Sequence, residues 1–161
     1  FDISLVKLNV FPMIQLTKLF LPVLKKFEKS FVLNMSSLGS LRPMPYKALY
    51  SASKAFIYSF SRAISSELKE DSVHVSVSCP AGVYTNDAAV KRIKVSGKIG
   101  KWTSLDTDIV AKYIVNGILN GKRLIIPGIG AKLLMILMKL LPENLNRWMV
   151  GRNMKRNRSA V

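Results

Sequence analysis

Apolar residues recur at helical spacing in three long segments, and three short apolar runs alternate with them along the chain. The helical spacing covers residues 2–27, the segment from about Tyr50 to Leu68, and the segment from Ser104 or Asp106 to about Leu119. Short apolar runs bounded by turn residues are typical of buried strands, and they occupy residues 31–35, 73–78 and 124–126. Strands that alternate with helices pair in parallel through right-handed crossovers. The pattern therefore predicts an α/β fold with a parallel sheet.

Two segments depart from this alternation. Residues 86–103 are basic, contain glycine and show only weak periodicity, so they predict a mobile loop over a site. Residues 131–141 predict an apolar helix that is too short to span a bilayer. This helix either covers the core or a subunit interface, or it lies at a membrane interface and also shapes an apolar substrate channel.

The charge of the chain is strongly positive. With 161 residues, 49% of them hydrophobic, the chain can bury a core, yet 25 lysines and arginines against 9 acidic residues give a net charge of +16. Two basic clusters stand out, from Lys91 to Lys101 and from Arg147 to Arg158. Each is either solvated surface or a contact for an anionic partner: a phosphorylated cofactor or carrier-linked substrate for the first, acidic lipid for the second. Neither has the interleaved aromatic residues of a stacking platform, so we expect no nucleic acid partner.

The single cysteine and the single histidine narrow the class of protein further. Cys79 excludes an internal disulfide and suits a reducing compartment, so we expect a cytoplasmic protein, with the basic tail as a contact to a membrane surface. Its position at a strand end favours a small buried core residue over a nucleophile. His74 lies in an alternating run and is expected to face solvent rather than to act as a base. No metal-ligand cluster can be assembled from the sequence.

Tyr50 and Lys54 carry the clearest chemistry, because residues four apart on a helix project from the same face. A phenol ordinarily has a pKa of about 10, so alone it is a poor acid or base at neutral pH. A neighbouring ammonium favours the phenolate and makes the tyrosine usable for proton transfer. Ser37 follows strand 31–35, where open α/β sheets place their ligand crevice, and its hydroxyl can bind a substrate oxygen.

Four segments around these residues follow the order and spacing of a known family. They are Leu8-Asn9-Val10-Phe11, Asn34-Met35-Ser36-Ser37 with Gly39, Tyr50 with Lys54, and Pro80-Ala81-Gly82-Val83-Tyr84-Thr85. In these segments the chain resembles the short-chain dehydrogenase/reductase family, over about residues 1–127. Pro12 and Ala81 stand where the family commonly has glycine. The resemblance implies the carboxy-terminal part of a Rossmann-type doubly wound parallel sheet, in three α/β/α layers, whose first half is absent.

The resemblance also implies catalytic roles. Tyr50 would be the general acid/base, and Lys54 would lower its pKa and hold the ribose hydroxyls of the cofactor. Ser37 would bind the substrate carbonyl or hydroxyl, and Asn9 would hold a proton-relay water. The implied function is hydride transfer on a small-molecule carbonyl/alcohol substrate, with a 3-oxoacyl or lipid-like ketone as the expected kind.

The implied cofactor is NADP or NAD, with NADP favoured. Besides the catalytic pair, the residues expected to bind it are Pro80, Gly82, Val83 and Thr85. Val83 and Thr85 would contact the nicotinamide carboxamide.

One part of the family's pattern has no counterpart, because the nine glycines never form the glycine-rich turn that holds a pyrophosphate. Phe1-Asp2 also matches the point where the family's fourth helix begins. We therefore expect the carboxy-terminal part of a longer enzyme, with a partial catalytic domain over residues 1–128 and an apolar helix and basic tail over residues 129–161. The alternative is an inactive fragment that keeps the site residues but cannot hold a dinucleotide. The complete protein is expected to be a homo-oligomer, and the chain alone is expected to self-associate.

Overall fold

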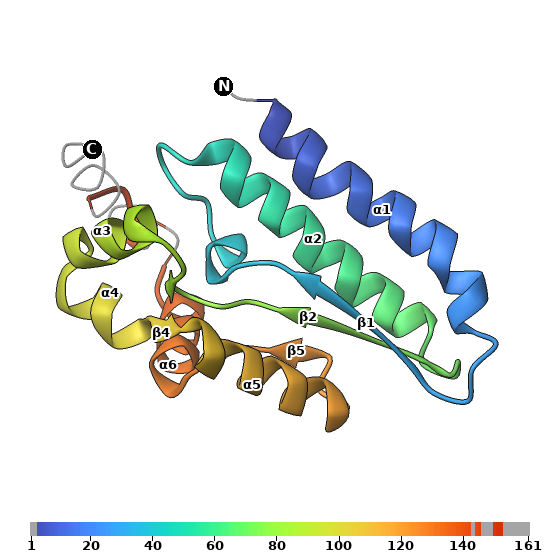
Figure 1. Cartoon of the computed structure of the whole chain (residues 1–161). Coiled ribbons are helices and arrows are strands. Elements are labelled where there is room, and N and C mark those ends of the chain that lie inside the picture. The colour runs from blue at the N-terminus through green and yellow to red at the C-terminus, as the bar shows by residue number, and fades with distance from the viewer. Residues whose placement is uncertain (1–2, 143, 146–149, 153–161) are drawn as a thin grey trace.

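The computed structural model describes residues 3–142, 144–145 and 150–152. Its helices are α1 (Ser4–Leu24), the 3₁₀ helix η1 (Leu38–Leu41), α2 (Ala48–Glu67), α3 (Asp87–Val95), α4 (Gly97–Thr103), α5 (Thr107–Leu119) and α6 (Ile129–Leu140) (Figure 1). Its strands are β1 (Ser30–Met35), β2 (Val73–Ser78), β3 (Val83–Tyr84), β4 (Leu105–Asp106) and β5 (Leu124–Ile125). Except for Arg152, the residues of the second basic cluster lie outside the described part of the chain.

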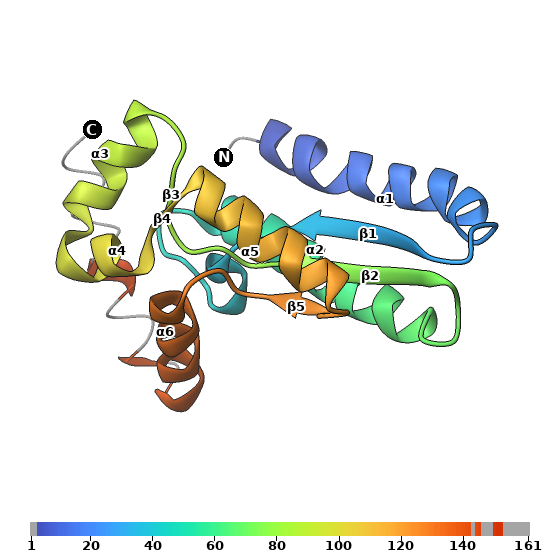
Figure 2. The same cartoon turned by 60° about the horizontal axis from the view of Figure 1, so that its bottom comes forward.

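β1, β2 and β5 form one parallel sheet in the order β1-β2-β5, and β3 and β4 form a short second pair. β1 and β2 pair along their whole length, whereas β5 adds two residue pairs to the other edge of β2. Within the described residues, β1 therefore pairs on one side only. α1 and α2 lie side by side on one face of the sheet and α5 covers the other (Figures 1 and 2). The predicted α/β class with a parallel sheet is confirmed.

The buried apolar residues explain why the helices lie on these faces. Val73 and Val75 of β2 are almost fully buried and pack with Leu68 beneath α1 and α2. Ile125 of β5 packs with Ile114 on the opposite side, beneath α5. Each such side chain stabilises the fold by about 1.5–3 kcal/mol when it leaves water. The central strand is thus buried on both faces, as its apolar run predicts.

Residues 86–103 do not form the loop that the sequence predicts, because they fold into α3 and α4. Asn86 caps α3, and its Oδ1 accepts a hydrogen bond from the N–H of Ala89 at 2.9 Å. Ala89 and Ile93, four residues apart, are both buried, while the basic residues of α3 stay exposed. Two buried positions in a short helix give little periodicity in a longer window. The loop prediction is therefore wrong.

His74 is a second correction, because its imidazole does not face solvent as expected. It is half-buried on β2, and the neighbouring strand places Phe31 directly opposite it. The two rings meet edge to face with their centroids 6.2 Å apart. The Nε2 atom is buried and has no hydrogen-bond partner in the described part of the chain.

α6 buries Gly130 and Ala131 near its start and exposes most of its other apolar residues. Ala131 is fully buried, whereas Ile129 and Leu140 are 72% and 77% exposed. Near the other end, Arg42 donates from Nε and Nη2 to the carbonyl oxygen of Met138, at 3.2 and 2.7 Å. No helix in the described part of the chain is long and apolar enough to cross a membrane. The division of the chain at residue 128 stays a prediction.

Candidate active site

The segment after β1 is tied to the segment after β2, at the edge where both parallel strands end. The N–H of Leu38 donates to the carbonyl of Pro80 at 2.8 Å, and the N–H of Ser36 donates to the carbonyl of Ser78 at 2.8 Å. The Oγ of Ser37 accepts from the N–H of Gly39 at 3.1 Å and so caps η1. These bonds fix Ser37 at the carboxyl end of β1, as its sequence position predicts.

Ser37 and Tyr50 flank Gly39. A Cβ added at Gly39 would lie 3.5 Å from the Oγ of Ser37, 3.7 Å from a ring carbon of Tyr50 and 2.6 Å from the Sδ of Met44. The added Cβ would clash only with the Sδ of Met44, which belongs to a flexible side chain, and would make ordinary contacts with Ser37 and Tyr50. Ser37 and Tyr50 line the same cleft, of about 750 Å³, which we call the site cleft.

Gly82, Val83 and Thr85 also line the site cleft, from the segment that follows β2. A Cβ at Gly82 would overlap the Oγ of Ser104. Only glycine at this position therefore lets the segment pack against the end of α4. The carbonyl of Gly82 accepts from the N–H of Leu105 at 3.1 Å, which adds the short β3–β4 pair. Pro80 is buried and does not line the cleft.

Lys54 lies one helical turn beyond Tyr50 on α2, and its Nζ donates to the carbonyl of Met35 at 3.0 Å, at the carboxyl end of β1. The Oγ of Ser36 in turn donates to the carbonyl of Lys54 at 2.7 Å. Burial lowers the pKa of Lys54, and the nearby Cys79 thiol partly opposes this effect. Cys79 itself is fully buried, as predicted, and burial raises the pKa of its thiol.

Asn9 is linked through Ser53 to the backbone of the α2 turn that begins at Tyr50. Its Nδ2 donates to the Oγ of Ser53 at 3.2 Å, and that hydroxyl donates to the carbonyl of Tyr50 at 3.0 Å. Asn9 and Lys54 line a second cavity of about 520 Å³ between α1, α2 and β1, which we call the edge groove. Ser37 and Tyr50 thus line one cavity, and Asn9 and Lys54 line another.

The sequence analysis did not single out as site residues the two positively charged residues of the site cleft, Lys47 and Arg92. Lys47 is the residue that precedes α2, and Arg92 lies on α3. Arg92 was counted in a basic cluster but assigned to a loop. The capping residue Asn86 and the spacing of Ala89 and Ile93 could have indicated the helix that brings it to the cleft. Within the described residues, no group of histidine, cysteine or acidic side chains could hold a metal ion.

The family model of the short chain dehydrogenases matches residues 3–95, which is more than half of the chain. The chain therefore belongs to the short-chain dehydrogenase/reductase family, whose members are oxidoreductases. The match includes Asn9, Ser37, Tyr50 and Lys54 and ends within the segment now described as α3.

Curated relatives match part of the chain. It is 38% identical to 17-beta-hydroxysteroid dehydrogenase type 3 of Mus musculus over 82 residues, which are 51% of this chain and 27% of that protein. It is 35% identical to the very-long-chain 3-oxoacyl-CoA reductase of Neurospora crassa over 89 residues, which are 55% of this chain and 27% of that protein. The matched part spans about a quarter of the length of these relatives.

Solved structures share the fold. A short chain dehydrogenase from Burkholderia cenocepacia in complex with NADP superposes with a TM-score of 0.72 at 16% identity, covering 90% of this chain and 58% of that chain. A 3-ketoacyl-(acyl-carrier-protein) reductase from Brucella melitensis complexed with NADH gives a TM-score of 0.54 at 24% identity, covering 68% and 46%. At these identities the likeness concerns the Rossmann-type α/β fold.

Proposed function

We propose that this chain carries the proton-transfer site of an NAD(P)-dependent oxidoreductase that interconverts a carbonyl and an alcohol. The observation that carries the proposal is the position of Ser37 and Tyr50 on either side of Gly39, in a cleft that Gly82, Val83 and Thr85 also line. An orienting hydroxyl and an acid/base phenol in one cavity are what such a reaction needs from the protein.

In the proposed reaction, the Ser37 hydroxyl donates a hydrogen bond to the substrate oxygen and holds it near the phenol. The Tyr50 hydroxyl gives its proton to that oxygen during reduction and recovers it during oxidation. The Lys54 ammonium, one turn away on α2, stabilises the phenolate that remains after this transfer. The Nδ2 of Asn9 is engaged with Ser53, so its Oδ1 is the atom proposed to hold a water of the relay.

A bound nicotinamide dinucleotide would supply or accept the hydride. The residues of the cleft fit its nicotinamide end, because Gly82 lines the cleft without a side chain, Val83 offers an apolar surface and the exposed Thr85 offers a hydroxyl for an amide group. Tyr50 and Lys54 would hold the ribose. Pro80 would act indirectly, since its carbonyl holds Leu38 and it does not line the cleft.

We propose a ketone with an apolar body as the substrate and reduction as the working direction. Leu38, Met44 and Leu134 give the site cleft apolar walls. The two kinds of relative are named for a hydroxysteroid and for a very-long-chain 3-oxoacyl-CoA, which both combine a reacting oxygen with a large apolar body. The basic residues of α3 add a preference for an acidic group, developed below.

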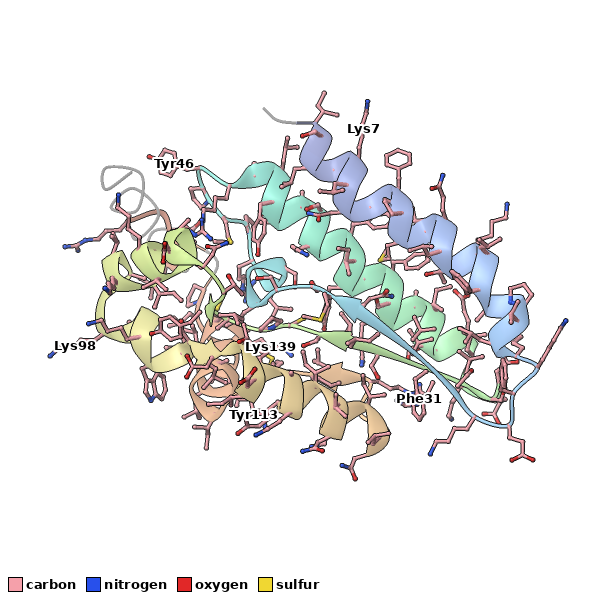
Figure 3. All side chains as sticks on the ribbon, in the orientation of Figure 1. Lys7, Phe31, Tyr46, Lys98, Tyr113 and Lys139 are labelled. Atoms are coloured by element: carbon pink, nitrogen blue, oxygen red, sulfur yellow. The ribbon has the colours of Figure 1, made fainter. Side chains whose placement is uncertain are left out.

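The Tyr50→Phe substitution tests this proposal in a catalytically competent preparation that contains this chain. Loss of the phenolic proton should reduce kcat by about 10²–10⁴-fold while the dinucleotide affinity changes little. Tyr113→Phe is the matched control, because Tyr113 lies on α5, away from the site cleft, and is 43% exposed (Figure 3). Near-normal turnover by Tyr50→Phe would contradict the assigned role.

The alternative is a chain that keeps the site residues without binding a dinucleotide. It is favoured by the missing glycine-rich turn and by the open edge of β1 beside Asn9 and Lys54. Calorimetry of the 161-residue chain with NADPH separates the two, because micromolar binding is expected only if the site is sufficient. A chain that binds weakly but restores turnover when joined to a glycine-rich amino-terminal half would support the enzyme.

A further inference from the structure

Two positive side chains line the site cleft together with Tyr50 and Ser37. Lys47 is half-buried and lies three residues before Tyr50, at the start of α2. Arg92 reaches the cleft from the exposed side of α3. Neither side chain makes a hydrogen bond or ion pair with another described residue. None of the described residues that line the cleft is acidic.

Two positive charges in one cleft are electrostatically unfavourable when no ligand is bound. Burial lowers the pKa of Lys47, and the positive charge of Arg92 lowers it further. α2 begins without a side-chain cap, so the positive end of its dipole adds to the potential at Lys47. The preceding residue, Tyr46, has a φ of 65°, a conformation that bulky residues rarely adopt and that often marks functional sites (Figure 3).

An anionic ligand would offset the repulsion between the two cations. Two cations that share a cavity without an acid bind a phosphate or carboxylate through charge-assisted hydrogen bonds. The wall of the same cavity includes apolar side chains, among them Met44, Ile99 and Leu134. A ligand that fills the cavity would therefore have a reacting oxygen at Ser37 and Tyr50, an apolar part and an acidic group.

We propose that Lys47 and Arg92 form an anion subsite that binds a phosphate or carboxylate carried by the substrate, as in an acyl thioester of coenzyme A. The subsite rests on the proposed function, since it names the substrate class of the same cleft. It distinguishes an acidic acyl thioester from an uncharged ketone such as a steroid.

Direct binding tests the subsite without any turnover. Calorimetry of the 161-residue chain with coenzyme A should give a dissociation constant that rises by roughly tenfold in Lys47→Met and again in Arg92→Gln. Lys98→Met is the matched control, because this exposed lysine projects away from α4, outside the cleft (Figure 3). Equal affinities in the wild-type chain and both cleft variants would overturn the proposal.

Kinetics of the competent enzyme show whether the two cations bind an acidic group of the substrate or of the dinucleotide. With acetoacetyl-coenzyme A, Lys47→Met and Arg92→Gln should each raise KM about tenfold, and with uncharged acetoacetyl-N-acetylcysteamine they should leave it unchanged. A rise in KM for NADPH with no difference between the two ketones would assign the cations to the dinucleotide and overturn the proposal. If the wild type turns over neither ketone, the proposed function fails, and the coenzyme A binding still decides the subsite.

The melting temperature separates a binding role from a structural one. Because the charged form of Lys47 is disfavoured in the folded chain, Lys47→Met should leave the melting temperature unchanged or raise it by about 2 °C. A clear fall in melting temperature that accompanies the loss of binding would make Lys47 a structural residue and overturn the proposal.

Discussion

The site cleft and the edge groove are both lined by residues of α2 and differ in the elements that close them. The walls of the site cleft come from the segments after β1 and β2, from α2, from α3 and α4, and from α6. The walls of the edge groove come from α1, α2 and the open edge of β1, and most of its lining is apolar. Among the described residues, the cleft is lined by two cations and no acidic side chain, whereas the groove is lined by Lys54, which donates to a backbone carbonyl.

Residues of one helix, α2, line both cavities. Tyr50 and Lys54 are one turn apart, yet Tyr50 lines the site cleft and Lys54 lines the edge groove. Tyr50, the proposed proton-transfer group, and Ser37 thus lie in a cavity that is lined by α2, η1, α3, α4 and α6. The group that would stabilise the phenolate and hold a ribose lies in the cavity with an open strand edge.

Among the predicted effects, the largest is the loss of activity in the Lys54→Met variant, which removes the ammonium group of the edge groove. Without the ammonium the phenolate of Tyr50 is no longer stabilised, so kcat/KM should fall by about 100-fold in a competent preparation. Both kcat and the dinucleotide affinity should suffer, unlike in Tyr50→Phe. Lys112→Met, at an exposed position of α5, is the control. A variant that loses only affinity would leave Lys54 as a binding residue.

The ionisation of Lys54 should also make kcat/KM depend on pH. Burial lowers the pKa of Lys54 below its ordinary value of 10.5. The ammonium form is present below the lowered pKa and is lost as the pH rises through it. The alkaline limb of kcat/KM should therefore begin below the usual range of a lysine, and Lys54→Arg should move it to higher pH because a guanidinium keeps its charge. An identical limb in both proteins would assign it to another group.

The Gly82→Ala substitution tests how tightly the site cleft is closed. The added methyl group would overlap the hydroxyl of Ser104, so the free energy of unfolding should fall by about 1–3 kcal/mol. Removing the overlapping side chain in a Gly82→Ala/Ser104→Gly double variant should recover most of this loss. Val32→Ile is the comparison in the edge groove, where an added methyl should change stability by less than about 0.5 kcal/mol. Equal costs at both positions in denaturant unfolding would remove the contrast.

The smallest effect is expected on self-association. Leu8 and Leu19 of α1 are 76% and 69% exposed, and β1 has an open edge beside them, so the chain should associate in light scattering as its concentration rises. A Leu8→Lys/Leu19→Lys variant should weaken this association by about tenfold, since two leucines would no longer be buried. Ile129→Lys, at a position of α6 that is 72% exposed, is the control. A monomeric wild-type chain would contradict the expectation.

The sequence predicts the parts of the fold that have strong periodicity. Val73–Ser78 is a strand with the predicted bounds, and Ser30–Met35 begins one residue earlier than expected. Short helices with two buried positions, such as Asp87–Val95, give a weak pattern in a long window, so only the capping residue and the spacing of the two buried positions indicate this helix. Ser37 and Tyr50 line one cleft, whereas Lys54, which was expected to share their site, lines the edge groove.

What the sequence could not give depends on how the elements pack against each other. Tyr50 and Lys54 project from the same face of α2 but line different cavities, because different elements surround the two turns of the helix. The packing of α3 brings Arg92 to the same cleft as Lys47, although 44 residues lie between them in the sequence. His74 is covered because Phe31 pairs opposite to it, which depends on the register of two strands.

The bond from Arg42 to Met138 bears on the order in which the molecule folds. It joins residues 96 positions apart, and contacts of such long range form late because the chain between them must first be ordered. During synthesis the carbonyl of Met138 emerges after every strand of the sheet. We therefore expect the sheet to form first, and the wall that α6 adds to the site cleft to close only when translation has passed this point.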